Sequence, residues 1–288
     1  LVLDAPIRYA LKRRDRARVH KAISLLSESG IESLAIGGAE RAGTEGWKED
    51  DLDREGSNAW HAHGSSAIRI DRAIDCWVRD VRTFKHSENR IGAHILSNGI
   101  LAREVRGLTL LRCHFQRPQY GGAGGNGYMF RLSESNEGLV QDCTAEFNRH
   151  GFVLSGMASS GNVFFRCTDK DTGRAVGGTG RYGTAGKSSD HHMHFSHSNL
   201  FDSCTAVNSS FQAAYRPYGS DPKHNLTAAH SVYWNTRGEG ERTSVITTDQ
   251  SRFGYVIGTW GAVSKVSTDS LAPTKTAPVD HVEGIGLG

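Results

Sequence analysis

The stretch SSDHHMHFSHSN, residues 188–199, is the densest group of side chains able to transfer protons or bind metals. If Met193 and Phe195 face a core, alternation along a strand places Asp190, His192 and His194 together on the outer face. One carboxylate beside two imidazoles can act as an acid–base pair or hold an ion such as zinc. Histidines that merely stabilise a loop are the alternative, and no residue is assigned as a metal ligand because no other ligand-like spacing supports one.

Two short charged stretches follow apolar segments at equivalent points. NRHG, residues 148–151, supplies Arg149 and His150, and DKD supplies Asp169, Lys170 and Asp171. If the two segments stack, these turns become neighbours and hold bases, a neutralising cation and a carboxylate pair. A solvated turn in which Lys170 pairs with its flanking aspartates is the alternative. The candidate catalytic residues are therefore Lys170, Arg149, His150, Asp171, Asp190, His192 and His194.

Other polar loops supply groups that bind sugar hydroxyls and carboxylates. The long loops are residues 85–94, 116–127, 148–151, 169–190 and 211–225, and we expect them to line one edge as a groove. The candidate substrate-binding residues in them are Arg216, Tyr218, Tyr120, Asn126 and Arg117. GAGGNG, residues 122–127, matches a dinucleotide fingerprint literally but opens no helical pattern, which favours a glycine turn.

A repeated pattern of apolar residues indicates the elements that position these groups. Four segments share this pattern, and each contains one cysteine: GLTLLRCHF, GLVQDCTAEF, NVFFRCTDK and NLFDSCTAV. Successive cysteines, at 113, 143, 167 and 204, are between 24 and 37 residues apart. AIDCWVRDVRTF, residues 73–84, fits with Val81 in the position of the cysteine. The alternation and the Val, Ile, Leu, Phe and Thr content predict short strands, and the repeat predicts a solenoid with loops of variable length.

Further segments without the cysteine extend the series at residues 30–38, 230–236 and 253–261, which predicts about eight rungs. The four aligned cysteines are predicted to form an inward ladder of thiols, because a catalytic thiol is not needed four times and side chains in register make poor disulfide partners. Cys76, offset in its segment, is also expected in the core.

The repeated rungs resemble those of right-handed parallel β-helix proteins of the pectate-lyase-like superfamily over about residues 30–260. We therefore expect an all-β, right-handed, single-stranded parallel β-helix with long loops along one edge. One domain is expected over residues 1–261, with a loop excursion at 39–66 and an irregular rung within 1–29. The polar tail, 262–288, is predicted to leave the solenoid, and the chain is expected to be an excerpt of a longer protein.

The resemblance implies a carbohydrate-active enzyme acting on an anionic polysaccharide, and we expect β-elimination by a lyase. By resemblance alone, Lys170, Arg149 or Arg216 would act as base or neutraliser and His150, His192 or Tyr218 as proton donor, with calcium a candidate cofactor. A glycoside hydrolase using Asp169, Asp171 and Asp190, a C5-epimerase, and a non-catalytic adhesin or phage spike remain open. A polymer substrate favours an extracellular or periplasmic location.

Composition excludes several other classes. The chain has 288 residues, 37% hydrophobic and 23% charged, with a net charge of +3, which is typical of a folded protein with little excess charge for nucleic acid. No apolar run reaches the 18 residues that a membrane-spanning helix needs. The expected partner is therefore a polysaccharide, with no nucleic acid and no membrane-spanning segment, and the oligomeric state stays open.

Overall fold

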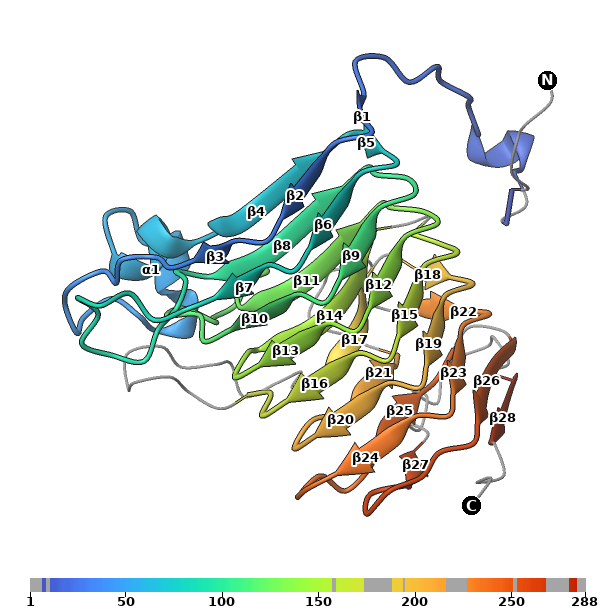
Figure 1. Cartoon of the computed structure of the whole chain (residues 1–288). Helices are drawn as coiled ribbons and strands as arrows, with labels where there is room; N and C mark the ends of the chain where they lie inside the picture. Colours follow the sequence, from blue (N-terminus) through green and yellow to red (C-terminus); the bar gives the residue numbers. More distant parts are fainter. Residues whose placement is uncertain are drawn as a thin grey trace.

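The protein is a parallel β-helix, as the repeated rungs predicted. A computed structural model describes residues 7–8, 11–156, 159–173, 188–193, 195–215, 227–250, 253–267 and 280–283. Three parallel sheets of nine, seven and eight strands run the length of the solenoid, and about eight coils stack in sequence order (Figure 1). No helix in these ranges is long and apolar enough to cross a membrane.

Each coil passes through the three sheets in the same order, so every sheet adds a strand per coil. Sheet 1 contains β2 (Gly30–Glu32), β6 (Trp77–Arg79), β9 (Thr109–Leu111), β12 (Leu139–Gln141), β15 (Val163–Phe165), β19 (Leu200–Asp202), β23 (Val232–Trp234), β26 (Phe253–Ile257) and β28 (Asp280–Glu283). Sheet 2 contains β3 (Ala35–Ile36), β7 (Arg82–Thr83), β10 (His114–Gln116), β13 (Thr144–Glu146), β16 (Thr168–Lys170), β20 (Thr205–Val207) and β24 (Arg237–Glu239). Sheet 3 contains β4 (Ser66–Asp71), β8 (Asn98–Arg103), β11 (Tyr128–Ser133), β14 (His150–Ser155), β17 (Ser189–Met193), β21 (Phe211–Ala213), β25 (Ile246–Thr248) and β27 (Val266–Ser267).

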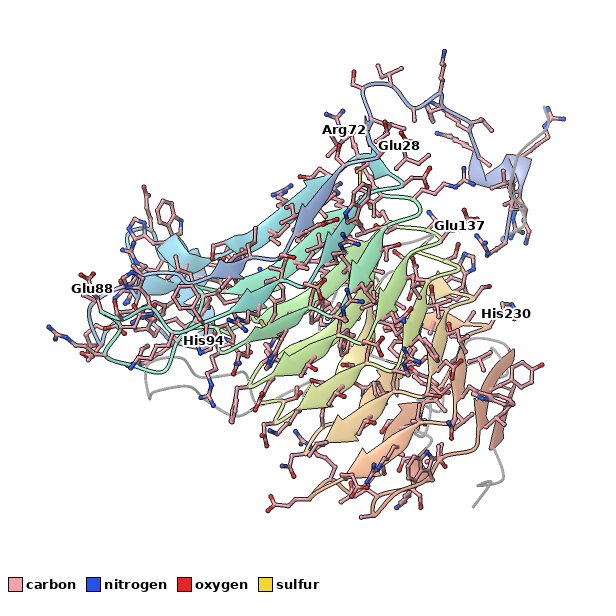
Figure 2. The ribbon with its side chains drawn as sticks, viewed as in Figure 1. Glu28, Arg72, Glu88, His94, Glu137 and His230 are labelled. Atoms are coloured by element: carbon pink, nitrogen blue, oxygen red, sulfur yellow. The ribbon has the colours of Figure 1, made fainter. Side chains whose placement is uncertain are left out.

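Residues with a left-handed backbone turn the chain between sheets. Arg112, Asp142 and Arg166 have φ of 51°, 52° and 51° and stand directly before Cys113, Cys143 and Cys167. Each cysteine segment is therefore two three-residue strands joined by a corner, and not one strand. At the corner between sheets 3 and 1, Glu28, Arg72, Glu137 and His230 have φ between 46° and 57°, and they lie across the solenoid from Glu88 and His94 (Figure 2). The short parallel pairs β1 (Leu26–Ser27) with β5 (Ala73–Ile74) and β18 (Ser196–His197) with β22 (Ala228–Ala229) line the same corner.

The solenoid interior is filled by stacked apolar side chains. All five cysteines are buried free thiols, which confirms the predicted core role of Cys76 and of the cysteine ladder. Phe130 stacks on Phe152 at 5.0 Å between ring centroids, and Phe164 stacks on Phe201 at 4.5 Å. Because neighbouring strands are in register, like side chains meet in successive coils, and this continuity holds the sheets in a fixed geometry.

Three segments differ from the regular coil. Residues 11–25, expected as an irregular rung, lie largely exposed around the short 3-10 helix η1 (Arg13–Asp15), and only β1 joins the solenoid. The excursion at 39–66 contains η2 (Glu49–Asp53) and α1 (Asn58–Ala62), with Trp47 packed in a separate small core. Within the tail predicted to leave the solenoid, β27 and β28 instead extend sheets 3 and 1.

Candidate active site

The loop-bearing edge lies between sheets 2 and 3. The loops that begin after β7, β10, β13 and β16 all cross this edge and lead into β8, β11, β14 and β17. The stretch 211–225, predicted to share it, instead starts within β21 of sheet 3, and its residues 216–225 lie outside the described residues. The described parts of four of the five predicted loops therefore lie along one edge.

Two aromatic rings stand at the first position of adjacent strands on this edge. Tyr128 begins β11 and His150 begins β14, and the two residues are paired in register. Their rings meet edge to face, 5.0 Å apart between centroids. The stacking of coils alone therefore places a phenol beside an imidazole.

A bulge in the next strand adds two further groups. In β17, Asp190 pairs with Val153 and His191 with Leu154, but Ser155 pairs with Met193, so His192 is an extra residue in the ladder. Such a bulge re-aims side chains, and here Asp190 and His192 contact each other on the outer side, as the alternation predicted. The inward side chain is His191, which is buried against Phe201, whereas Met193 and Phe195 are only half-buried.

These side chains form one hydrogen-bonded line. Asp190 Oδ2 lies 3.1 Å from Nδ1 of His192, and Nε2 of His192 lies 2.9 Å from the Tyr128 hydroxyl. The same carboxylate oxygen is 3.4 Å from Nδ1 of His150, which is also 2.8 Å from the backbone oxygen of Ser188. Asp190 and His150 are buried, and the His192 side chain is 14% exposed, so His192 is the member of the line that solvent reaches most directly.

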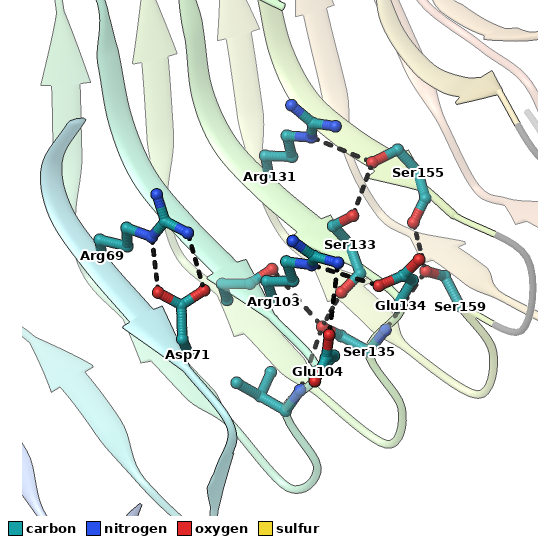
Figure 3. A network of polar contacts seen from close by, with 12 residues as sticks. Arg69, Asp71, Arg103, Glu104, Arg131, Ser133, Glu134, Ser135, Ser155 and Ser159 are labelled. Atoms are coloured by element: carbon teal, nitrogen blue, oxygen red, sulfur yellow. Dashed lines mark hydrogen bonds and ion pairs between the residues drawn. The ribbon is translucent and has the colours of Figure 1, made fainter. Parts of the chain in front are cut away.

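Two arginines flank the Tyr128 ring. Arg149 donates from Nη1 to the Tyr128 hydroxyl at 3.4 Å, and its guanidinium carbon lies 5.7 Å from the ring centroid. Arg131 lies 5.5 Å from the same centroid and donates to Ser155 at 3.0 Å, as Figure 3 shows on the outer face of sheet 3. The site thus combines a carboxylate, two imidazoles, a phenol and two permanent cations.

The glycine turn at 122–127 packs against this site. A Cβ at Gly125 would lie 3.3 Å from Nη1 of Arg131, and a Cβ at Gly127 would lie 2.9 Å from that of Arg149. Both glycines have positive φ, of 84° and 74°. The segment is therefore a turn, as predicted, and its glycines allow it to pack closely against the two arginines.

Asp169 lies behind the site, inside the solenoid. It is fully buried, in register with Ala145 and Ala206, and not at the outer edge where the DKD turn was expected. Its carboxylate accepts hydrogen bonds from four neighbouring side chains, Asn148, Thr172, Ser189 and Ser209, at 2.7–3.1 Å. Because Asn148 precedes Arg149 and Ser189 precedes Asp190, this carboxylate anchors the backbone of both site segments.

The other predicted residues of the DKD turn are separate from the site. Lys170 is on the outer face of sheet 2, where its ammonium group lies 3.0 Å from Glu146, which is also 3.3 Å from His114. Asp171 is a corner residue with φ of 53° and accepts a hydrogen bond from Asn208 at 2.8 Å. The two turns do adjoin as predicted, because the Phe147 N–H donates to the Lys170 carbonyl at 3.0 Å and the Gly173 N–H donates to the Asn148 carbonyl at 2.6 Å. The side chains of Lys170 and Asp171 nevertheless bond to Glu146 and Asn208, so they do not supply the cation and the carboxylate expected beside His150.

Three predicted substrate-binding residues support the loops. Arg117 stacks on Phe147 at 3.8 Å from the ring centroid, again at the corner after sheet 2. Tyr120 is fully buried and its hydroxyl donates to the Glu49 carbonyl at 2.9 Å. Asn126, also buried, accepts from Gly64 and Ser97 at 3.0 and 2.9 Å. Tyr120 and Asn126 thus hold the excursion to the solenoid, and His194, Arg216 and Tyr218 lie outside the described residues.

Of the residues predicted as catalytic, Arg149, His150, Asp190 and His192 do lie together. Tyr128 and Arg131 were missed. Aligning the sheet 3 strands on Phe130 and Phe152 places Tyr128 beside His150, so a register comparison of successive coils could have found the phenol.

The arrangement can transfer protons next to positive charge. If His192 donates from Nδ1 to Asp190, its Nε2 accepts the Tyr128 hydroxyl hydrogen and favours loss of that proton. Arg149 and Arg131 then stabilise negative charge on the phenol or on a bound anion.

No family model matches the chain, and no curated protein matches it. Among solved structures, the chain is similar to the alginate lyase from Paenibacillus sp. str. FPU-7, with 7% identity and a TM-score of 0.43 over 72% of this chain and 76% of that one. It is also similar to the endo-xylogalacturonan hydrolase from Aspergillus tubingensis, with 12% identity and a TM-score of 0.42 over 91% of this chain and 80% of that one. At these identities neither similarity assigns a residue or a reaction to this chain.

Proposed function

We propose that this protein is a carbohydrate-active enzyme that cleaves an anionic polysaccharide by β-elimination. The observation that carries the proposal is the line of hydrogen bonds from Asp190 through His192 to Tyr128, ending on Arg149. Elimination at a uronate needs a base for the proton beside the carboxylate, a cation to neutralise that carboxylate, and an acid for the leaving oxygen.

The site offers a group for each of these tasks. Tyr128, aligned by His192, is the proton-transfer group that removes the proton and can return it to the leaving oxygen. Tyr128 is 1% exposed, so the substrate must reach its hydroxyl past the partly exposed His192. Arg149 and Arg131, both half-buried, are the cations that neutralise the uronate carboxylate.

The outer face of sheet 3 carries polar or charged side chains in three successive coils, which suits an extended polymer. Register pairs place Arg131 beside Leu101 and Val153, and Ser133 beside Arg103 and Ser155, at the strand spacing of about 4.8 Å. Hydroxyl and guanidinium groups at regular intervals can contact successive sugars of one chain.

Hydrolysis is the weaker alternative because it needs two carboxylates on opposite sides of the bond. Asp190 is buried and contacts both histidines, Asp169 lies inside the solenoid, and Asp171 bonds to Asn208 at the sheet 2 corner. The three aspartates predicted for a hydrolase therefore do not form a pair around one substrate position.

The test is to incubate the full chain with polyuronates and neutral polysaccharides while following ultraviolet absorbance of unsaturated products and new reducing ends. We expect both signals on a polyuronate, and a fall in kcat of about 100-fold or more for Tyr128→Phe, which keeps the ring and removes the hydroxyl. Lys170→Ala is the matched control, because its ion pair is on sheet 2, and it should retain activity.

Reducing ends without absorbance would replace elimination by hydrolysis. Polysaccharide binding with neither signal would favour the non-catalytic glycan-binding alternative. Loss of activity in Lys170→Ala with full activity in Tyr128→Phe would move the active site to sheet 2.

A further inference from the structure

Two imidazoles converge on a single carboxylate oxygen at the edge of sheet 3. Asp190 Oδ2 lies 3.4 Å from Nδ1 of His150 and 3.1 Å from Nδ1 of His192. The three residues present one ligand atom each, all within 4.8 Å of one another. The Asp190 and His150 side chains are 0% and 1% exposed, so this is a buried cluster with little access for water.

These separations match the edges of a metal coordination shell. Donor atoms about 2.0–2.2 Å from a tetrahedral zinc ion lie about 3.3–3.6 Å from one another. The oxygen–nitrogen separations of 3.4 and 3.1 Å need only small movements to reach that geometry. We propose that His150, Asp190 and His192 bind one divalent transition-metal ion, for which zinc is the best fit.

The donor set selects the class of ion. Calcium takes six to eight oxygen ligands, whereas imidazole nitrogens suit zinc, nickel, copper and iron. Two of the three donors here are imidazoles and the cluster holds one carboxylate. The site therefore favours a transition metal over the calcium that the sequence suggested as a candidate cofactor.

A neighbouring group already orients one of the two imidazoles. A metal-bound histidine keeps a hydrogen on its other nitrogen and donates it to a fixed partner. For His192 that partner is the Tyr128 hydroxyl, 2.9 Å from Nε2. In His150 the hydrogen on Nδ1 points to the Ser188 carbonyl at 2.8 Å, so binding at this nitrogen must displace a proton. Affinity should therefore fall as pH is lowered.

The metal site itself does not depend on the proposed reaction; only the effect of the bound ion on Tyr128 rests on the proposed function. An ion on Nδ1 of His192 would leave a hydrogen on Nε2, which would donate to the Tyr128 oxygen and stabilise the phenolate. Nε2 would then no longer accept the Tyr128 proton, as it does in the metal-free line, and that proton would be released to solvent. In the proposed elimination, metal binding would thus favour the basic form of Tyr128.

The test uses the full chain, freed of any histidine tag and stripped of metals with a chelator that is then removed. Calorimetric titration with Zn²⁺ should give one ion per chain, and Co²⁺ should give intense visible absorption bands of a four-coordinate site. Ca²⁺ should bind at least about 100-fold more weakly than Zn²⁺. His192→Gln and Asp190→Asn should each lower Zn²⁺ affinity by at least about 100-fold, and Tyr128→Phe by about 10- to 100-fold.

His114→Gln is the matched control, because His114 also lies 3.3 Å from a carboxylate, that of Glu146, but on sheet 2. It should bind Zn²⁺ as the parent chain does. Because Asp190 is buried, His192→Gln at the partly exposed position keeps the test valid if Asp190→Asn does not fold.

Absence of stoichiometric binding, or equal loss in His114→Gln and His192→Gln, would overturn the metal site. These titrations contain no polysaccharide, so they are independent of the proposed reaction. Cleavage by the metal-stripped chain without tight metal binding would support the proposed function and reject the metal site; tight binding with no cleavage of any polyuronate would do the reverse.

Discussion

Replacing Asp169 tests whether a buried carboxylate in the solenoid core holds the segments of the candidate active site in place. The side chain is fully buried and accepts hydrogen bonds from Asn148, Thr172, Ser189 and Ser209 at 3.1, 2.7, 2.8 and 2.7 Å. These donors come from the loops and strands of three successive coils. The carboxylate is therefore a common acceptor for the corner that carries Arg149 and Asp190.

Asp169→Ala removes the acceptor and leaves polar groups buried. The Ser209 hydroxyl has a second contact with Thr172 at 3.0 Å, so two or three of the four donors would lose their bond. At about 1–3 kcal/mol for each unsatisfied buried group, the free energy of unfolding should fall by about 3–6 kcal/mol.

Asp169→Asn keeps the shape and removes the charge, which isolates the effect of pH. Burial raises the pKa of Asp169 above its usual value, although the four hydrogen bonds oppose the shift. The folded chain therefore holds the proton at pH values where the unfolded chain, with an ordinary pKa of about 3.9, has lost it. Its contribution to stability is full below that pKa and is lost as pH rises through the raised value, at up to about 1.4 kcal/mol per pH unit.

Urea denaturation of the parent chain and both variants at a series of pH values measures these effects. In the difference between the free energies of unfolding of the parent and Asp169→Asn, the contributions of all other titrating groups cancel. The free energy of unfolding of the parent relative to the variant should therefore fall as pH rises above about 4. A parallel pair of profiles would refute the raised pKa, and a loss below 1 kcal/mol in Asp169→Ala would refute the anchoring role.

Four further predictions concern packing. A Cβ at Gly151 would lie 2.4 Å from Oδ1 of Asp169, so Gly151→Ala should lower stability by about 1–3 kcal/mol in urea titrations; an unchanged midpoint would show that the corner adapts freely. Phe164→Ala, in the aromatic stack with Phe201, should cost about 3–5 kcal/mol, measured in the same way. The five buried thiols should resist alkylation in the folded chain and react fully in urea, and rapid native labelling counted by mass spectrometry would contradict their place in the core. Tyr120→Phe should cost about 1 kcal/mol through loss of the bond to Glu49. Because burial raises the pKa of Tyr120 to about 12, spectrophotometric titration of the variant should show one fewer tyrosine ionising near pH 12.

The coil architecture could be predicted because it repeats. Cysteines and aromatic residues recur at equivalent positions, and strands in register bring them together in successive coils. The motif of one coil therefore predicts the structure of the other coils. The alternation placed Asp190 and His192 on one side, but its premise that Met193 and Phe195 face the core was wrong, because His191 is the inward residue. The bulge at His192 could not be predicted, because the extra residue appears only when β17 is paired with β14.

The place of Lys170 was missed for a different reason. Each cysteine follows a left-handed corner, so residues after Cys167 belong to sheet 2, while His150 begins a strand of sheet 3. Counting two positions from the inward Cys167 reaches Asp169, which explains why that carboxylate faces the core and Lys170 faces out. Lys170 is three residues after Cys167 (170 − 167) and pairs with Glu146, three residues after Cys143 (146 − 143), whereas Arg149 is six residues after Cys143 (149 − 143). Lys170 and Arg149 therefore do not occupy equivalent positions on the solenoid.

The corner between sheets 2 and 3 brings the candidate reactive groups together. Gly151 permits Asp169 to approach from inside, while His150, the residue before it, contacts Asp190 on the outside. Ser189 bonds Asp169 through its side chain and the next residue, Asp190, meets both histidines. The inner carboxylate thus fixes the backbone from which the outer carboxylate projects. Because the same short segments carry the anchoring and the reactive groups, loss of Asp169 should weaken metal binding as well as stability, whereas Phe164→Ala, deeper in the stack, should affect stability first.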